Sequence, residues 1–304
     1  MNSISTEILE KYQIRKSKKQ KTAFIEFLRA HFPELKVEES LFGVSRNIVI
    51  GNPSTAKAVL TAHYDTCARM FVPNFIMPQK PALSFGYGFL IAVPMVLISL
   101  AIGALVGRIA EDGALGNAAY IVSLWLMLIM MLFGPANRHT ANDNTSGVIT
   151  LAELLSTMSP EERAQTCFVF FDNEEKGLLG SSFFAKEHKA EMKEKLLINF
   201  DCVSDGDYLI LILSKKAFSE HAESLKAAFA DVTEKTVLIE SGKGIYYPSD
   251  QKNFKKNIGV ASFKKSKFGL YMNRIHTDKD TVTDERNIAV LTFGIRKFLG
   301  SIIQ

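Results

Sequence analysis

Short runs of wholly apolar residues alternate along the chain with longer segments whose apolar positions recur every three or four residues. The first pattern is typical of buried strands, and the second indicates amphipathic helices that cover a sheet. The predicted strands span 58–62, 166–171, 196–200, 208–213, 236–240 and 258–263, and the predicted helices span 5–32, 146–155, 178–188, 217–230 and 286–301. Residues 36–50 are expected to form a hairpin. This alternation predicts an α/β fold, a mostly parallel mixed sheet flanked by helices on both faces.

Two uncharged apolar segments interrupt the alternation. They span residues 83–106 and 114–133, and a short polar turn joins them. About 20 apolar residues suffice for a helix to cross the hydrocarbon core of a bilayer. We therefore expect residues 81–136 to form an inserted transmembrane helical hairpin, with residues 1–80 and 137–304 forming one domain. A pair of long helices that makes a dimer interface or an apolar lid is the alternative.

The net charge of +4 is modest, and most of the surplus lies in one basic run at residues 11–21. Such a run on a helix usually forms a solvated face, and the apolar segments favour attraction to anionic lipid headgroups as the alternative. Nucleic-acid binding is not expected, because no aromatic or glycine-rich reader motif accompanies the charge.

Charge also predicts which side of the membrane the larger domain occupies. The basic run, Lys80 and Arg138 flank the apolar segments, whereas the turn between these segments carries more acidic than basic residues. Positive charge favours the inner side, so we expect a cell-membrane protein whose larger domain faces the cytoplasm. The start of the chain shows no signal-peptide pattern, and three unpaired cysteines are compatible with a reducing compartment.

Residues able to bind metal ions follow several of the predicted strands. They occur in five segments, which in chain order are 62–66 (Ala-His-Tyr-Asp-Thr), 142–147 (Asn-Asp-Asn-Thr-Ser-Gly), 172–175 (Asp-Asn-Glu-Glu), 199–201 (Asn-Phe-Asp) and 275–277 (Ile-His-Thr). Each segment alone is weak evidence, because a lone His-x-Asp is more often a structural pair. Together they supply imidazole and carboxylate ligands for two divalent cations, with one glutamate to spare for proton transfer. Their position at strand ends agrees with this chemistry.

These motifs resemble those of metallopeptidase family twenty-eight, which includes zinc aminopeptidases, glutamate carboxypeptidase II and glutaminyl cyclase. The resemblance covers residues 57–66 and 140–300, where Glu-Glu-x-Gly-x-x-Gly-Ser and His-Thr-x-x-Asp-Thr complete the pattern. It implies two zinc ions held by five residues. His63 and Asp201 would bind one ion, Glu175 and His276 would bind the other, and Asp143 would bridge the two.

The same resemblance implies two catalytic residues. Glu174 would be the general base that deprotonates the bridging water and later protonates the leaving amine. Asp65 would orient His63 by accepting its second ring N–H. The family has a histidine where this chain has Gln251, so Asp250 before it receives no role beyond a wall of the substrate pocket.

The function that follows is a membrane-anchored di-zinc aminopeptidase acting on peptides, in contact with the lipid bilayer through residues 83–133. A noncatalytic membrane binding module is one alternative, and a glutaminyl cyclase is another, although those cyclases work with one zinc. A deacylase of the carboxypeptidase G2 type uses similar ligands, but the Asp-Asn-x-Ser-Gly and His-Thr-x-x-Asp-Thr motifs speak against it. The choice between amino- and carboxypeptidase action, the preferred residue, the native metal and a homo-oligomeric state stay open.

Overall fold

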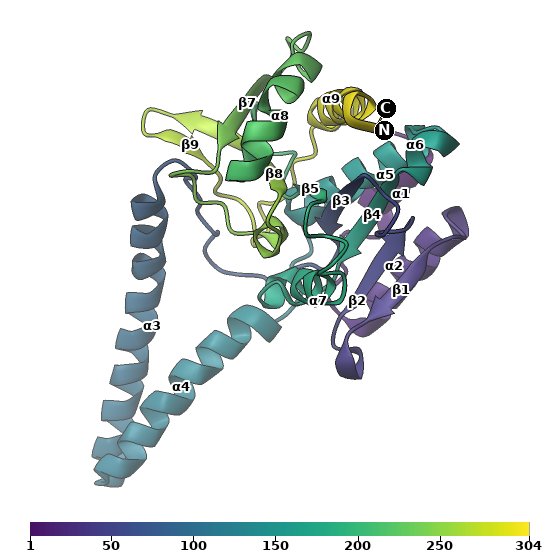
Figure 1. The fold of residues 1–304 in the computed structure, drawn as a ribbon. Helices are drawn as coiled ribbons and strands as arrows, with labels where there is room; N and C mark the ends of the chain where they lie inside the picture. Colours follow the sequence, from purple (N-terminus) through teal and green to yellow (C-terminus); the bar gives the residue numbers. More distant parts are fainter. Residues whose placement is uncertain (304) are drawn as a thin grey trace.

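A computed structural model describes residues 1–303, and within them one mixed sheet contains nine strands (Figure 1). The sheet order is β1–β2–β4–β3–β5–β8–β6–β7, and β9 pairs with β8. The strands are β1 (Lys36–Glu39), β2 (Arg46–Ile50), β3 (Ala58–His63), β4 (Thr166–Phe171), β5 (Leu196–Phe200), β6 (Tyr208–Leu213), β7 (Thr236–Ser241), β8 (Asn257–Ser266) and β9 (Gly269–Tyr271). The four central strands β4, β3, β5 and β8 run parallel to one another. The predicted mostly parallel mixed sheet is confirmed.

Helices cover both faces of the sheet, as predicted. One face packs against α1 (Ser3–Lys11), α2 (Lys18–His31), α5 (Gly147–Thr157), α8 (Lys215–Ala228) and α9 (Glu285–Ile303). The other face packs against α7 (Leu179–Glu187). A short helix that the pattern does not predict, α6 (Pro160–Ala164), precedes β4.

The mostly apolar composition of the central strands follows from this two-sided burial. In β4, Phe168 and Phe170 face the core beneath the five helices, whereas Val169 and Phe171 face the core that contains Phe184 of α7. Successive side chains of a strand point to opposite faces, so a strand covered on both sides is apolar at nearly every position.

The predicted single helix over residues 5–32 is wrong. The chain forms α1 and α2 separately, with a loop between them that carries the fully buried Arg15. Ser17 caps α2 by accepting the backbone N–H of Gln20, and the Gln20 side chain accepts the backbone N–H of Ser17 in return. This reciprocal capping box starts a new helix where the apolar pattern alone continues the old one.

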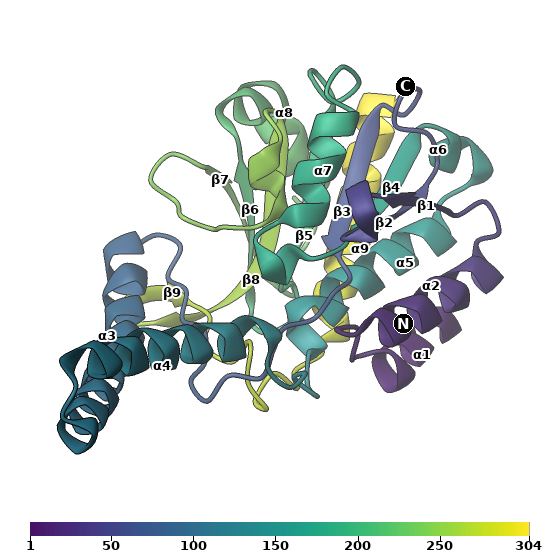
Figure 2. The same ribbon diagram turned by 90° about the horizontal axis from the view of Figure 1, so that it is seen from below.

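The two apolar segments form α3 (Pro81–Ala110) and α4 (Gly113–Phe133), which project from the rest of the protein as an arm (Figures 1 and 2). We call the remainder the α/β body. Both helices are long and apolar enough to cross a membrane by length and composition. They pack closely at Gly103, Gly107 and Gly116, where a Cβ atom added to Gly103 would lie 2.8 Å from the carbonyl oxygen of Gly116.

The two segments that connect the arm to the body lie side by side. The backbone N–H of Arg69 donates to the carbonyl of Pro135 over 2.8 Å, and that of Asn137 donates to the carbonyl of Cys67 over 3.2 Å. Because Cys67 follows shortly after the end of β3, the base of the arm is joined directly to the carboxyl edge of the sheet.

Candidate metal centre

Three neighbouring parallel strands end at the same edge of the sheet and deliver predicted site residues there. His63 is the last residue of β3, Asp201 directly follows β5, and Asp172 directly follows β4 ahead of the pair Glu174 and Glu175. Because β4, β3 and β5 are neighbours in the sheet, the three chain segments that follow them lie next to one another.

Asp143 reaches the same edge from an irregular turn, Ala141–Ser146, that leads into α5. The turn is held by Asp280, whose two carboxylate oxygens accept the backbone N–H groups of Asn142 over 2.8 Å and of Asp143 over 3.0 Å. The side-chain oxygen of Asn142 accepts the backbone N–H groups of Ser204 over 2.7 Å and Asp205 over 3.0 Å. The turn is therefore fixed on both sides, although its backbone is not regular.

The Asp143 carboxylate lies between two histidines. Its Oδ1 is 3.4 Å from His63 Nε2, and its Oδ2 is 3.0 Å from His276 Nε2. His63 Nε2 also lies 3.5 Å from Asp201 Oδ1, and His276 Nε2 lies 3.4 Å from Glu175 Oε2. The five predicted ligands thus form two adjoining groups that share one carboxylate, in the pairing that the sequence motifs imply.

Electrostatics in these two groups favour bound cations. Burial raises the pKa of Glu175 to about 8. Burial lowers the pKa of His276, but the Glu175 and Asp143 carboxylates outweigh it and raise this pKa to about 9. Among residues 1–303, Glu175 Oε1 and Asp201 Oδ1 are buried without a hydrogen-bond partner. Since an unpaired buried carboxylate is costly, this donor set fits divalent metal ions.

Asp65 connects the two halves of the site. The ring Nδ1 of His63 lies 3.1 Å from the backbone carbonyl of Asp65 and 3.6 Å from its carboxylate. The same carboxylate accepts the backbone N–H groups of Glu174 over 2.9 Å and Glu175 over 3.3 Å. Asp65 is therefore positioned to fix the His63 ring mainly through its carbonyl, while its carboxylate holds the Glu174–Glu175 turn.

Glu174 lies beside these groups without joining either of them. Burial raises its pKa well above the usual range, despite the opposing charge of His63. A half-buried carboxyl group next to a metal centre is placed to exchange a proton with a group bound there, and its raised pKa favours holding that proton.

Two cations of the predicted basic run, Arg15 and Lys21, are buried beneath the site, so the interpretation of the run as a solvated or lipid-facing surface is wrong for these two and is left to the exposed Lys11, Lys18 and Lys19. Arg15 donates to the backbone carbonyl of Tyr64 and to Thr145 Oγ1, the latter over 3.2 Å. Lys21 forms an ion pair with Asp172. The run therefore contains buried cations that contact residues at the strand ends and other cations that are exposed.

Sequence reasoning missed two residues of the site. Asp280 belongs to the His-Thr-x-x-Asp-Thr motif, so the signal was present, but its contact with the Asp143 turn depends on tertiary structure. Cys67 places a sulfur within 4.8 Å of ligand atoms of Glu175 and His276. Only its closeness in sequence to His63 could have suggested this. Asp250, which received no role, is fully buried near Glu174, and burial raises its pKa to about 7.

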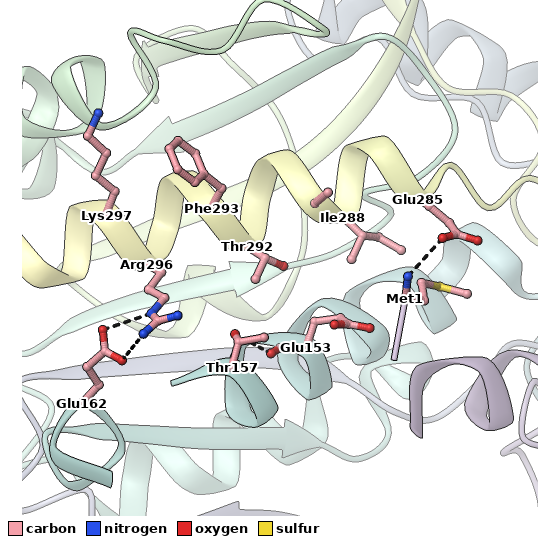
Figure 3. A pocket seen from close by; sticks show the side chains of 11 residues that line it. Met1, Glu153, Thr157, Glu162, Glu285, Ile288, Thr292, Phe293, Arg296 and Lys297 are labelled. Atoms are coloured by element: carbon pink, nitrogen blue, oxygen red, sulfur yellow. Dashed lines mark hydrogen bonds and ion pairs between the residues drawn. The ribbon is translucent and has the colours of Figure 1, made fainter. Parts of the chain in front are cut away.

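A separate surface pocket of about 610 Å³ lies elsewhere, between α9, α5 and the start of the chain (Figure 3). It is bordered by the ion pairs Arg296–Glu162 and Met1–Glu285. None of the predicted metal ligands lines this pocket.

Comparison with protein families gives a match that covers most of the chain. The sequence profile described as Peptidase family M28 matches residues 47–296, which include every residue of the two ligand groups. The chain belongs to peptidase family M28. No curated protein sequence matches it.

Solved structures of low sequence identity share the fold of this M28 chain. Glutaminyl cyclase from Porphyromonas gingivalis is 14% identical with a TM-score of 0.57, and the match covers 98% of this chain and 97% of that one. The LapA aminopeptidase of Legionella pneumophila is 13% identical with a TM-score of 0.53, and the match covers 97% and 69% respectively. Glutaminyl cyclase from Macrostomum lignano is 11% identical with a TM-score of 0.54, and the match covers 98% and 88%.

Proposed function

We propose that this M28 chain is a membrane-anchored, metal-dependent aminopeptidase with two zinc ions. The observation that carries the proposal is the Asp143 carboxylate, with one oxygen 3.4 Å from His63 Nε2 and the other 3.0 Å from His276 Nε2. A carboxylate between two such groups would be shared by two cations, which would supply Lewis acidity there. His63 and Asp201 would complete one position, and Glu175 and His276 the other.

The residues around the centre divide the reaction between them. When bound, the cations supply Lewis acidity toward a peptide carbonyl and toward water. Glu174 accepts the proton of the attacking water and returns it to the amine that leaves when the peptide bond breaks. Asp65 holds Glu174 in place through the backbone hydrogen bond and keeps the His63 ring oriented.

Replacing Glu174 by glutamine tests this assignment. The variant should retain its metal, because Glu174 lies outside both ligand groups, and lose activity by roughly 10²–10⁴-fold, as expected when a general acid–base is removed. Glu187→Gln on the exposed side of α7 is the matched control. The assay uses aminoacyl amides and tripeptides with free or acetylated N-termini, with metal content measured on the same samples.

The alternatives predict other results in this assay. Hydrolysis of acetylated peptides would exclude an aminopeptidase, and ammonia release from peptides with N-terminal Gln would indicate a cyclase. A chain that binds no metal and hydrolyses nothing would be a noncatalytic module.

The arm supports the membrane part of the proposal. α3 and α4 present mostly exposed apolar side chains, and they project from the body instead of being covered by it (Figure 1). Lys16 of the body donates a hydrogen bond to the backbone carbonyl of Leu132, near the end of α4, over 2.7 Å. A basic side chain therefore lies beside the arm on the body side. We therefore assign the arm to the cell membrane and the body to the cytoplasmic face.

This assignment is tested by alkaline extraction of membranes and by labelling single cysteines in intact cells. A cysteine placed in the turn between α3 and α4 should react with an impermeant reagent added outside, whereas one placed on α9 should not. The opposite labelling pattern would show that the orientation is reversed. Release of the protein from membranes by alkali would show that it is not anchored.

A further inference from the structure

The turn between β1 and β2 exposes three apolar side chains. Leu41 is 77% exposed, Phe42 is 91% exposed and Val44 is 57% exposed. Turns are usually built from small or polar residues. Phe42 also adopts a left-handed backbone conformation, with φ 62°, which is unfavourable for a residue with a bulky side chain. The fold thus maintains an outward phenyl ring at a position where its backbone would favour glycine.

This turn lies on the side of the body from which the arm projects. Figure 1 places it at the lower edge of the body, and Figure 2, seen from below, places it in the foreground together with α3 and α4. Contacts connect it to the end of α4. The Asn173 side chain donates to the carbonyl of Val44 over 2.6 Å, and Lys176 Nζ lies 5.7 Å from the centre of the Phe133 ring.

Cations lie near the apolar turn, and so does one carboxylate, because Glu39 Oε2 is 3.6 Å from an ideal Cβ at Gly43. Arg46, directly after it, donates to the backbone carbonyl of Lys18 over 3.2 Å, which brings the first turn of α2 alongside. Lys18 and Lys19 are both exposed. Apolar side chains flanked by lysines are the composition of a segment that enters the headgroup region of an anionic membrane.

We propose that residues 41–44 form a second lipid contact, which dips into the surface of the bilayer that the arm enters. The inference rests on the proposed membrane anchoring of α3 and α4, to which the turn is linked only indirectly, through Asn173 and Lys176. A second contact away from the arm stops the body from pivoting on its two connecting segments. Because Asn173 joins the turn to Glu174, the edge of the sheet that carries the metal centre is held at the membrane surface. The substrates that fit this placement are peptides that lie at or emerge from the bilayer.

Tryptophan fluorescence in vesicles tests the contact on the full chain. The sole native tryptophan, Trp125 in α4, is replaced by phenylalanine, and Phe42→Trp is introduced in that background. Phe293→Trp is the matched control, because Phe293 is 54% exposed on α9, at the far side of the body from the arm (Figures 1 and 3). The vesicles contain phosphatidylcholine and phosphatidylglycerol, with or without brominated acyl chains.

We expect the emission from position 42 to shift to shorter wavelength and to be quenched by the brominated lipid, whereas emission from position 293 stays unchanged. Equal behaviour of the two positions would overturn the proposal. If Phe42→Trp does not fold, Leu41→Trp takes its place. Burial of the probe that depends on protein concentration in detergent would indicate contact between copies of the chain and would also overturn it.

The unmodified chain separates failure of this inference from failure of the anchor. Quenching of native Trp125 without quenching at position 42 would support the proposed anchor and refute the second contact. Absence of quenching at Trp125 as well would refute both the anchor and the second contact. In the enzyme assay, Phe42→Ser should lower hydrolysis of a peptide held to vesicles by a C-terminal acyl chain, while hydrolysis of a soluble tripeptide stays unchanged.

Discussion

Replacing Asp280 by asparagine should loosen the metal centre without removing any proposed ligand. Asp280 accepts two backbone N–H groups, from Asn142 over 2.8 Å and from Asp143 over 3.0 Å. An asparagine amide keeps one acceptor and turns an N–H₂ donor toward the other N–H. A hydrogen bond to a charged acceptor contributes about 1.5–3 kcal/mol. If that loss falls on the placement of Asp143, metal affinity drops by about 10- to 150-fold, since each 1.4 kcal/mol is about a factor of ten.

The measurement is competition for zinc with a chromophoric chelator, followed by peptide hydrolysis at saturating zinc. Asp278→Asn is the matched control, because Asp278 lies on the same loop but is exposed and pairs with Arg69 over 2.6 Å. Thermal unfolding of both metal-free variants separates loss of the site from loss of the fold. Unchanged zinc affinity in Asp280→Asn, or an equal loss in Asp278→Asn, would refute the positioning role.

Two further predictions concern the arm and the protonation of the site. Gly103→Ala should destabilise the α3–α4 contact by about 1–3 kcal/mol through overpacking. Gly86→Ala is the control and should leave the stability unchanged, because a Cβ at Gly86 meets no described atom within 4 Å. Both variants are denatured in mixed micelles, and unfolding is followed by circular dichroism. In the metal-free chain the pKa values of Glu175, about 8, and His276, about 9, mean that both groups hold protons at neutral pH. Zinc must displace these protons, so its apparent affinity should rise between about pH 6 and about pH 9. Calorimetric titration in buffers of different ionisation enthalpy should detect proton release, and a pH-independent affinity would contradict the two pKa values.

The sheet and the strand-end residues could be predicted because their causes are local in the sequence. β3, β4 and β5 are each wholly buried, so most of their positions are apolar, and residues able to bind metal gather where each strand ends. Parallel pairing then places His63 and Asp201 at one edge without further information. The two helices of the arm could also be predicted, because their long uncharged apolar segments are local in the sequence.

The N-terminal segment could not be predicted from charge and periodicity. Arg15 is buried because the backbone carbonyl of Tyr64 and the hydroxyl of Thr145, both distant in sequence, accept hydrogen bonds from its guanidinium, and no local pattern reveals such partners. The break between α1 and α2 did have a local signal, since Ser17 and Gln20 have the spacing of a capping box. The short strand β9 follows β8 after a turn at Ser266–Gly269 and is too brief for an alternating pattern to indicate it.

The position of the arm within the chain also sets the order in which the protein can assemble during synthesis. β3 is translated before α3, but its two neighbours in the sheet, β4 and β5, are translated only after α4. Until then β3 has two open edges and six apolar or otherwise buried residues, a combination that invites aggregation. If the arm enters the bilayer as proposed, it is available for insertion before the sheet can close. In that case any pause during synthesis of the arm would prolong the lifetime of an unpaired central strand, and with it the need for chaperones.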